Sequence, residues 1–203
     1  SEMELYGVIS EYSWMDDEIT PKLFKDDLYK LGNGGPITVR IDSPGGDVIA
    51  ASVIRSIMTD YPGKITTRID GVAASAAVII AMAGQNVRIM DTAYMMIHDP
   101  AVMVFLAMLD IATLDQLHTR LKSIKTGIVD TYASKTGLSA ERISRMMAEE
   151  TWMSAREAVN YGFANEIIDG GQKAKPANNV MTNLAYVNTL KTYVNVPQSL
   201  LSS

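Results

Sequence analysis

The chain has 203 residues, of which 47% are hydrophobic and 20% are charged, and its formal net charge is −5. This length and balance indicate one globular domain with a substantial core. The acidic balance and the lack of any Lys/Arg block count against a nucleic-acid partner. The absence of cysteine excludes disulfides and thiolate metal sites, and two histidines leave little for another metal site. We therefore expect neither a metal nor a cofactor.

Strand-like and helix-like segments alternate along the first half of the chain. Thr20 is followed by Pro21, the pattern of an N-cap and a proline at the first helical position. Ile37, Val39 and Ile41 alternate with polar residues, as in a half-buried strand. Strands are predicted at residues 2–9, 37–41, 64–69, 87–90 and 93–97, and helices at 21–32, 48–58 and 75–84. This alternation favours an α/β fold with a largely parallel sheet.

The second half of the chain is mainly helical. Apolar residues three and four positions apart predict a long helix over about residues 108–134, which would project from the domain. Shorter helices are predicted at 139–147 and 154–162, the second of them opened by a capping box. A last short strand is predicted at 167–168. We assign residues 1–170 to one domain and interpret residues 171–203 as a C-terminal extension of unknown role.

No segment of the sequence is expected to enter a membrane. The longest apolar stretch covers roughly residues 72–83, which is shorter than the about 20 residues that a bilayer requires. No basic-then-apolar signal segment opens the chain. We therefore expect a cytoplasmic location.

Ser75 stands where a nucleophile would be placed. It follows a predicted strand and opens a small apolar helix, so its hydroxyl can lie at the sheet edge. The alternative is that Ser75 is only a small residue that lets an alanine-rich helix pack closely. A serine hydroxyl needs a base. Of the two histidines, His98 ends a predicted strand, where sites collect in α/β folds, whereas His118 lies within the long helix.

Two further features would complete a catalytic site. Adjacent glycines in the segment 43–47, with the sequence SPGGD, let the backbone approach a substrate, although such a segment can also be an ordinary turn. The amides of Gly46 and Ala76 would then form an oxyanion hole with two donors. A carboxylate should accept the other imidazole N–H. The residues alone leave four candidates open: Asp47, Asp99, Glu149 and Glu150.

Four motifs, taken in order, resemble the proteolytic subunit of the Clp protease. They are IDSPGGD at 41–47, GVAAS at 71–75, MIHDP at 96–100 and SAREAVNYG at 154–162. The likeness covers roughly residues 2–170. The opening segment and the residues Glu-Thr-Trp-Met before Ser154 are most similar to the phage- or prophage-encoded branch, which includes head-maturation proteases.

The resemblance implies a role for each matched residue. Ser75 falls on the nucleophile, His98 on the base, and Gly46 and Ala76 on the oxyanion donors. Glu150 falls where the family usually has an aspartate. The implied fold is a ClpP/crotonase-type superhelix of repeated ββα units, with the long helix as a handle that joins rings.

The same resemblance implies partners. They are polypeptide substrates and further copies of the chain, arranged in a heptameric ring or a stacked double ring. A Clp ATPase or phage capsid proteins would be additional partners. The resemblance implies no cofactor.

The leading hypothesis is a serine endopeptidase that hydrolyses peptide bonds inside a ring-shaped chamber. Ser75 would form the acyl-enzyme, with His98 as the general base. One alternative is a crotonase-type acyl-CoA enzyme, which shares the fold but would need acid/base carboxylates and a CoA pocket. The other is a ring-forming scaffold without activity, which the glutamate at position 150 and the unusual tail would suggest.

Overall fold

The computed structural model describes residues 1–13, 18–102, 104, 106–169 and 180–201. These residues form a single sheet of seven strands. Five of them run parallel in the order β1 (Glu2–Tyr6), β2 (Ile37–Ser43), β3 (Ile65–Ala74), β4 (Asn86–Met90) and β7 (Glu166–Ile168). β5 (Tyr94–Ile97) pairs in parallel with the last residues of β3, and β6 (Thr151–Ser154) pairs antiparallel with β5.

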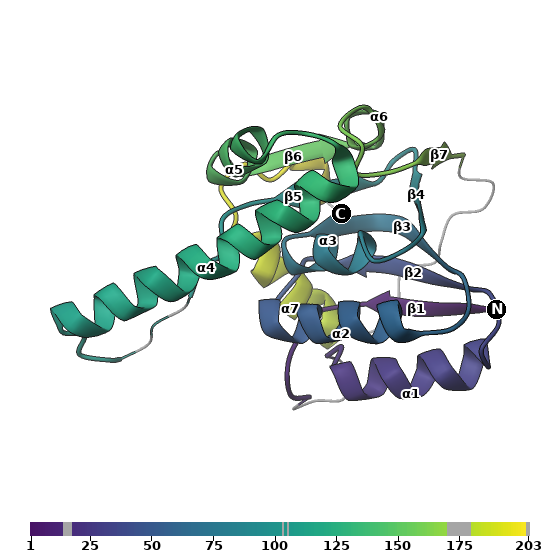
Figure 1. Ribbon diagram of the computed structural model, residues 1–203, viewed down its shortest axis with the longest axis horizontal. Coiled ribbons are helices and arrows are strands. Elements are labelled where there is room, and N and C mark those ends of the chain that lie inside the picture. The colour runs from purple at the N-terminus through teal and green to yellow at the C-terminus, as the bar shows by residue number, and fades with distance from the viewer. Residues whose placement is uncertain (14–17, 103, 105, 170–179, 202–203) are drawn as a thin grey trace.

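Helices surround this sheet, and one of them projects as an arm (Figure 1). The described helices are α1 (Pro21–Gly32), α2 (Val48–Asp60), α3 (Ala76–Ala81), α4 (Ile111–Thr136), α5 (Ala140–Ala148), α6 (Ala155–Asn160), α7 (Val180–Leu190) and α8 (Gln198–Leu201). α1, α2 and α3 cover one face, against which the apolar side chains of β2, such as Val39 and Ile41, are fully buried. α4 leads away from the domain, and its outer half lies clear of the sheet.

The opposite face of the sheet is covered, near the end of β3, by the C-terminal segment. Side chains alternate along a strand, so Val72 and Ala74 point away from the face on which Ala73 packs. With Met96 they form a second, smaller core cluster. The partly buried side chains that pack on this cluster are Trp152, Tyr186, Tyr193 and Leu200. Residues from the middle and from the C-terminal part of the sequence therefore meet at the end of β3.

The predicted α/β class, with a largely parallel sheet, is confirmed. Local capping patterns in the sequence correctly predicted where α1 and α6 begin. Thr20 caps α1 by accepting from Leu23 N at 3.3 Å, and Ser154 forms the predicted capping box with Glu157. The projecting helix extends over Ile111–Thr136, close to the predicted 108–134.

The predicted strands and helices differ from the structure in several places. β1 ends at Tyr6 instead of residue 9, because Gly7 adopts φ 118° and turns the chain out of the extended conformation. β3 continues to Ala74 instead of ending at residue 69. β6, α7 and α8 were not predicted at all. Among the described residues, no helix is long and apolar enough to cross a membrane.

Candidate active site

Ser75 lies at a strained turn between a strand and a helix. β3 ends at Ala74 and α3 begins at Ala76, and Ser75 between them has φ 54° and ψ −121°. A positive φ is unfavourable for a residue with a side chain, so the surrounding structure must hold it. The backbone N–H of Ser75 donates to Met96 O at 2.8 Å, which fixes the turn against β5. Such a turn presents a serine hydroxyl at the end of a sheet.

His98 lies within hydrogen-bonding distance of this serine. It directly follows β5, whose pairing with β3 aligns Met96 with Ala74. Ser75 Oγ and His98 Nε2 are 2.7 Å apart. In the tautomer with a proton on Nδ1, the serine hydroxyl donates to Nε2, which is the arrangement that general-base catalysis requires. The structure therefore brings together the two residues for which the sequence predicted nucleophile and base.

Burial favours the neutral form of the His98 imidazole. Desolvation lowers its pKa below the ordinary histidine value, and the negative charges of Glu150 and Asp99 act in the opposite direction. A neutral imidazole can accept the proton of the serine hydroxyl.

The glycine loop packs directly against the serine. A Cβ atom on Gly45, where φ is 97°, would lie 2.6 Å from Ala74 O and 2.9 Å from Ser75 Cβ, so only glycine fits. The amide of Gly45 donates to Ser43 Oγ at 3.1 Å. The amide of Gly46 has no acceptor within the described parts of the chain, and Ala76, as the first residue of α3, has no intrahelical acceptor. Among the described residues, neither amide predicted as an oxyanion donor is thus engaged by a backbone acceptor.

Glu150 is near His98, but its carboxylate is engaged elsewhere. Glu150 Oε2 accepts from Val194 N at 2.9 Å, and Oε1 accepts from Asn195 N at 2.6 Å and from Trp152 Nε1 at 3.2 Å. No hydrogen bond joins Glu150 to His98 in the described structure. The charge of Glu150 nevertheless acts on the pKa of His98 more strongly than that of Asp99. The structure therefore brings Glu150 to the site without placing it against the imidazole.

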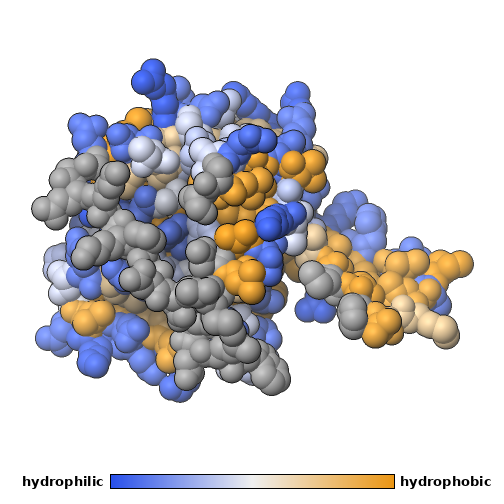
Figure 2. Space-filling view, turned by 180° about the vertical axis from the view of Figure 1, so that it is seen from behind, coloured by the Kyte–Doolittle hydropathy of each residue, from blue (hydrophilic) through white to orange (hydrophobic). Residues whose placement is uncertain are grey.

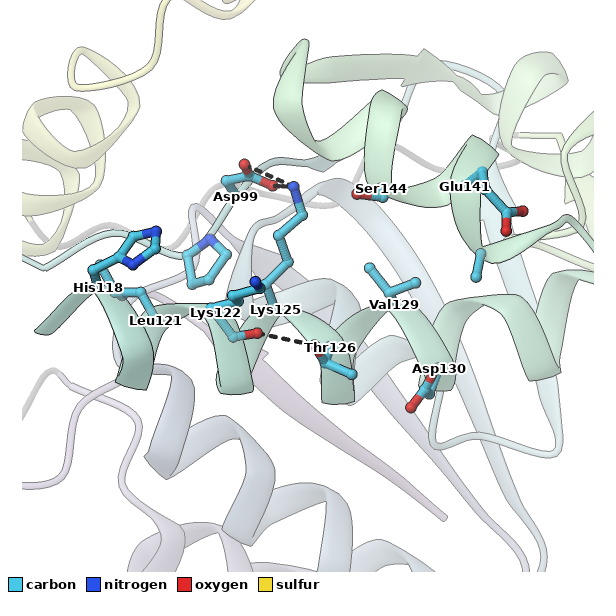
Figure 3. A pocket seen from close by; sticks show the side chains of 12 residues that line it. Asp99, His118, Leu121, Lys122, Lys125, Thr126, Val129, Asp130, Glu141 and Ser144 are labelled. Carbon is cyan, nitrogen blue, oxygen red and sulfur yellow. Dashed lines mark hydrogen bonds and ion pairs between the residues drawn. The ribbon is translucent and has the colours of Figure 1, made fainter. Parts of the chain in front are cut away.

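The other three carboxylate candidates have different partners. Asp99 forms an ion pair with Lys125 on α4, at 2.7 Å (Figure 3). Asp47 caps α2, where it accepts from Ala50 N at 2.6 Å. Glu149 has an exposed side chain at the end of α5. Among the described residues, none of these three makes a hydrogen bond to His98.

Two hollows adjoin the segment that follows His98, and Pro100 lines both of them. A groove of about 670 Å³ opens between α4 and α5 and is lined by Asp99, His118, Lys125 and Glu141, among others (Figure 3). Ser75 does not line it, so His118 on α4 lies apart from the serine, as the sequence predicted. A second cavity, of about 20 Å³, is lined by Ser75 and His98 together with apolar side chains that include Ile79, Ile128 and Tyr132.

One residue of the site was missed by sequence analysis. The ring of Tyr193 meets the ring of His98 edge to face, with centroids 5.1 Å apart. Tyr193 Oη donates to Pro44 O at 2.7 Å, across 149 positions of the chain. No local pattern around Tyr193 indicates this position, because its neighbours in the sequence show neither a motif nor a clear period.

Fold and site together define a class of protein. A serine at a strand-to-helix turn, a histidine that can accept its proton, and two available amides beside it form a site suited to acyl transfer. On an α/β scaffold, this arrangement is that of a serine hydrolase.

Comparisons with known proteins give the family. The family model described as Clp protease matches residues 8–171. The ATP-dependent Clp protease proteolytic subunit 1 of Chlamydia muridarum is 32% identical over 138 residues, which cover 66% of this chain and 71% of the relative. For subunit 1 of Chlamydia abortus, identity is 30% over 164 residues, covering 76% of this chain and 84% of the relative.

A solved structure supports the same assignment. A mutant of ClpP1 from Listeria monocytogenes matches with a TM-score of 0.71 and 26% identity, over 83% of this chain and 91% of that chain. The chain belongs to the Clp protease family and is a serine peptidase.

Proposed function

We propose that this chain is an endopeptidase that cleaves peptide bonds through an acyl-enzyme on Ser75. The observation that supports this most directly is the 2.7 Å distance between Ser75 Oγ and His98 Nε2. It is supported further by the positive φ that Ser75 adopts at the turn between β3 and α3.

The chemistry follows from this geometry. His98 Nε2 takes the hydroxyl proton as Ser75 Oγ attacks the carbonyl carbon of the peptide, and the oxyanion accepts hydrogen bonds from Gly46 N and Ala76 N. The imidazolium then protonates the leaving amine, and the C–N bond breaks to leave an acyl-serine. Water, deprotonated by His98, attacks this ester and restores Ser75. Glu150 stabilises the imidazolium through its charge, and it would orient the ring if its carboxylate turned toward Nδ1.

We further propose that the chain assembles into a ring of copies that encloses the active sites. The arm formed by α4 and the segment before it carries exposed apolar side chains that a free monomer would leave in water. Figure 2 shows this apolar surface on the projecting arm. The exposed residues are Val102, Val104, Leu106, Met108, Ile111 and Leu114. The relatives are named as ATP-dependent Clp protease proteolytic subunits, which supports a Clp ATPase as the partner that delivers substrate.

The alternatives receive less support. The family match favours a peptidase over a crotonase-type acyl-CoA enzyme. The close contact between Ser75 and His98 counts against a scaffold that has lost its activity.

Membership of the phage-encoded branch, with cleavage of capsid proteins, stays a prediction. Incubation of the purified chain with phage capsid protein, followed by mass spectrometry of the products, tests it.

Labelling with a fluorophosphonate probe tests the nucleophile. We expect the wild-type chain to react once per subunit and mass spectrometry to locate the adduct on Ser75, because only a serine activated by a base attacks this phosphorus centre quickly. Ser75→Ala should not label, whereas Ser154→Ala, which removes a helix cap, should label like the wild type. Adducts on another residue, or equal labelling of Ser75→Ala, would exclude Ser75 as the nucleophile.

The pH dependence of kcat/KM should report the lowered pKa of His98. The base acts only when neutral, so kcat/KM should fall as the pH drops through a pKa that lies below the ordinary value for histidine. Glu150→Gln removes a charge that raises this pKa, and the acidic limb should move to still lower pH. Measurement of kcat/KM with a fluorogenic peptide between acidic and neutral pH checks both statements. A shift of the acidic limb to higher pH in Glu150→Gln would contradict this account of the site.

A further inference from the structure

The chain beyond residue 180 returns across the catalytic site. α7 is held on the sheet by Tyr186, whose Oη donates to Asp42 Oδ1 at 2.7 Å. Asp42 lies near the end of β2, directly before the glycine loop. α7 ends at Leu190, which is 1% exposed. This attachment brings the next residues, 191–195, to the end of β3 where Ser75 lies.

Tyr193 contacts the catalytic site through both its ring and its hydroxyl. Its ring contacts that of His98, and its hydroxyl donates to Pro44 O in the glycine loop. Burial raises the pKa of Tyr193 to about 12, while the neighbouring Ser75 side chain acts in the opposite direction. The phenol therefore lies against His98 and the glycine loop, the two groups that would flank the carbonyl of a bound peptide.

The two residues after Tyr193 engage the carboxylate of the site. Val194 N and Asn195 N both donate to Glu150, and Asn195 Nδ2 donates to Glu149 O at 3.3 Å. Glu150 is held with φ 52°, a conformation unusual for glutamate. While these bonds persist, the Glu150 oxygens are committed to the backbone of this segment and not to the imidazole.

We propose that residues 186–195 form an occluding segment, which closes the active site of its own subunit and must move away before a peptide can bind. This inference rests on the proposed function of Ser75 and His98.

The attachments that hold the segment are few enough for it to open. Between Tyr186 and Asn195, the described hydrogen bonds to the site come from the side chains of the two tyrosines and Asn195 and from the amides of Val194 and Asn195. The side chain of Val194 is 84% exposed, and Lys191 and Thr192 are also exposed. A site that is open for only a fraction of the time reacts with a large probe more slowly by that same fraction. Loss of one attachment should therefore accelerate the reaction at Ser75.

The test is the rate at which a fluorophosphonate–rhodamine probe labels Ser75 in the full chain. We expect Tyr193→Ala to label at least about tenfold faster than the wild type, because it loses both the ring and the hydroxyl contact. Tyr193→Phe keeps the ring and should lie between the two. Tyr186→Phe removes one hydroxyl far from the reacting atoms and should also accelerate labelling. Lys191→Ala changes an exposed side chain of the same segment that makes no described contact with the site, and it should label like the wild type.

The outcomes separate the two proposals. If Tyr193→Ala and Tyr186→Phe label Ser75 at the wild-type rate or more slowly, the occluding role is wrong and the serine peptidase proposal stands. If no protein labels, the assignment of Ser75 fails. In that case, acrylamide quenching of Trp152 fluorescence tests the occlusion, because the Tyr193 ring packs against Trp152 with centroids 6.2 Å apart. A Trp14→Phe background removes the other tryptophan, so that the fluorescence reports on Trp152 alone. Stronger quenching in Tyr186→Phe supports the segment's opening, and equal quenching overturns it.

Discussion

Alanine at either Ser75 or His98 should lower kcat for peptide hydrolysis by a factor of about 10⁴ to 10⁶. The two residues share one proton across the 2.7 Å contact, so neither acts without the other. The double variant should therefore be no slower than the slower single variant. Such non-additivity distinguishes a catalytic pair from two residues that each support the fold.

The measurement is kcat and KM with a fluorogenic peptide, together with native mass as a check on assembly. His118→Ala is the matched control, because His118 is exposed on α4 and lines the groove away from Ser75. We expect His118→Ala to keep kcat close to that of the wild type. A His98→Ala variant that retains most of the activity would show that another group removes the serine proton.

Local sequence signals predicted much of this structure, because each of them acts over a few residues. The cap at Thr20, the capping box at Ser154 and the strand-to-helix position of Ser75 all depend on neighbours in the chain. The approach of His98 to Ser75 could be predicted because parallel strands end at the same edge of a sheet.

The parts that could not be predicted depend on contacts between distant residues. Nothing near Glu150 indicates that its carboxylate accepts from amides more than 40 positions away. Tyr186 and Asp42 are 144 positions apart, and neither belongs to a pattern that requires the other. The resemblance assigned Glu150 to the carboxylate position of the catalytic site. In the structure, however, its oxygens accept hydrogen bonds from backbone amides of the C-terminal segment. Tertiary packing, and not local propensity, sets this part of the site.

Gly45→Ala should lower kcat by a factor of about 10² to 10³ while leaving the chain folded. The new Cβ would lie 2.6 Å from Ala74 O and 2.9 Å from Ser75 Cβ. Neither of these two atoms can move away by a rotamer change, as the end of a flexible side chain could. The loop must therefore move away from Ser75 and take the amide of Gly46 with it. The oxyanion of the transition state then loses one of its two hydrogen-bond donors.

Gly137→Ala provides the control for backbone strain. Gly137 has φ 76°, close to the 97° of Gly45, but a Cβ there would meet nothing within 4 Å. Both variants should lose about 1 kcal/mol or more of stability from the positive φ, measured as a lower melting temperature. Only Gly45→Ala should lose kcat, since only its loop adjoins the nucleophile. Equal kcat values in the two variants would mean that the SPGGD loop does not stabilise the oxyanion, and the donors would have to be sought elsewhere around Ser75.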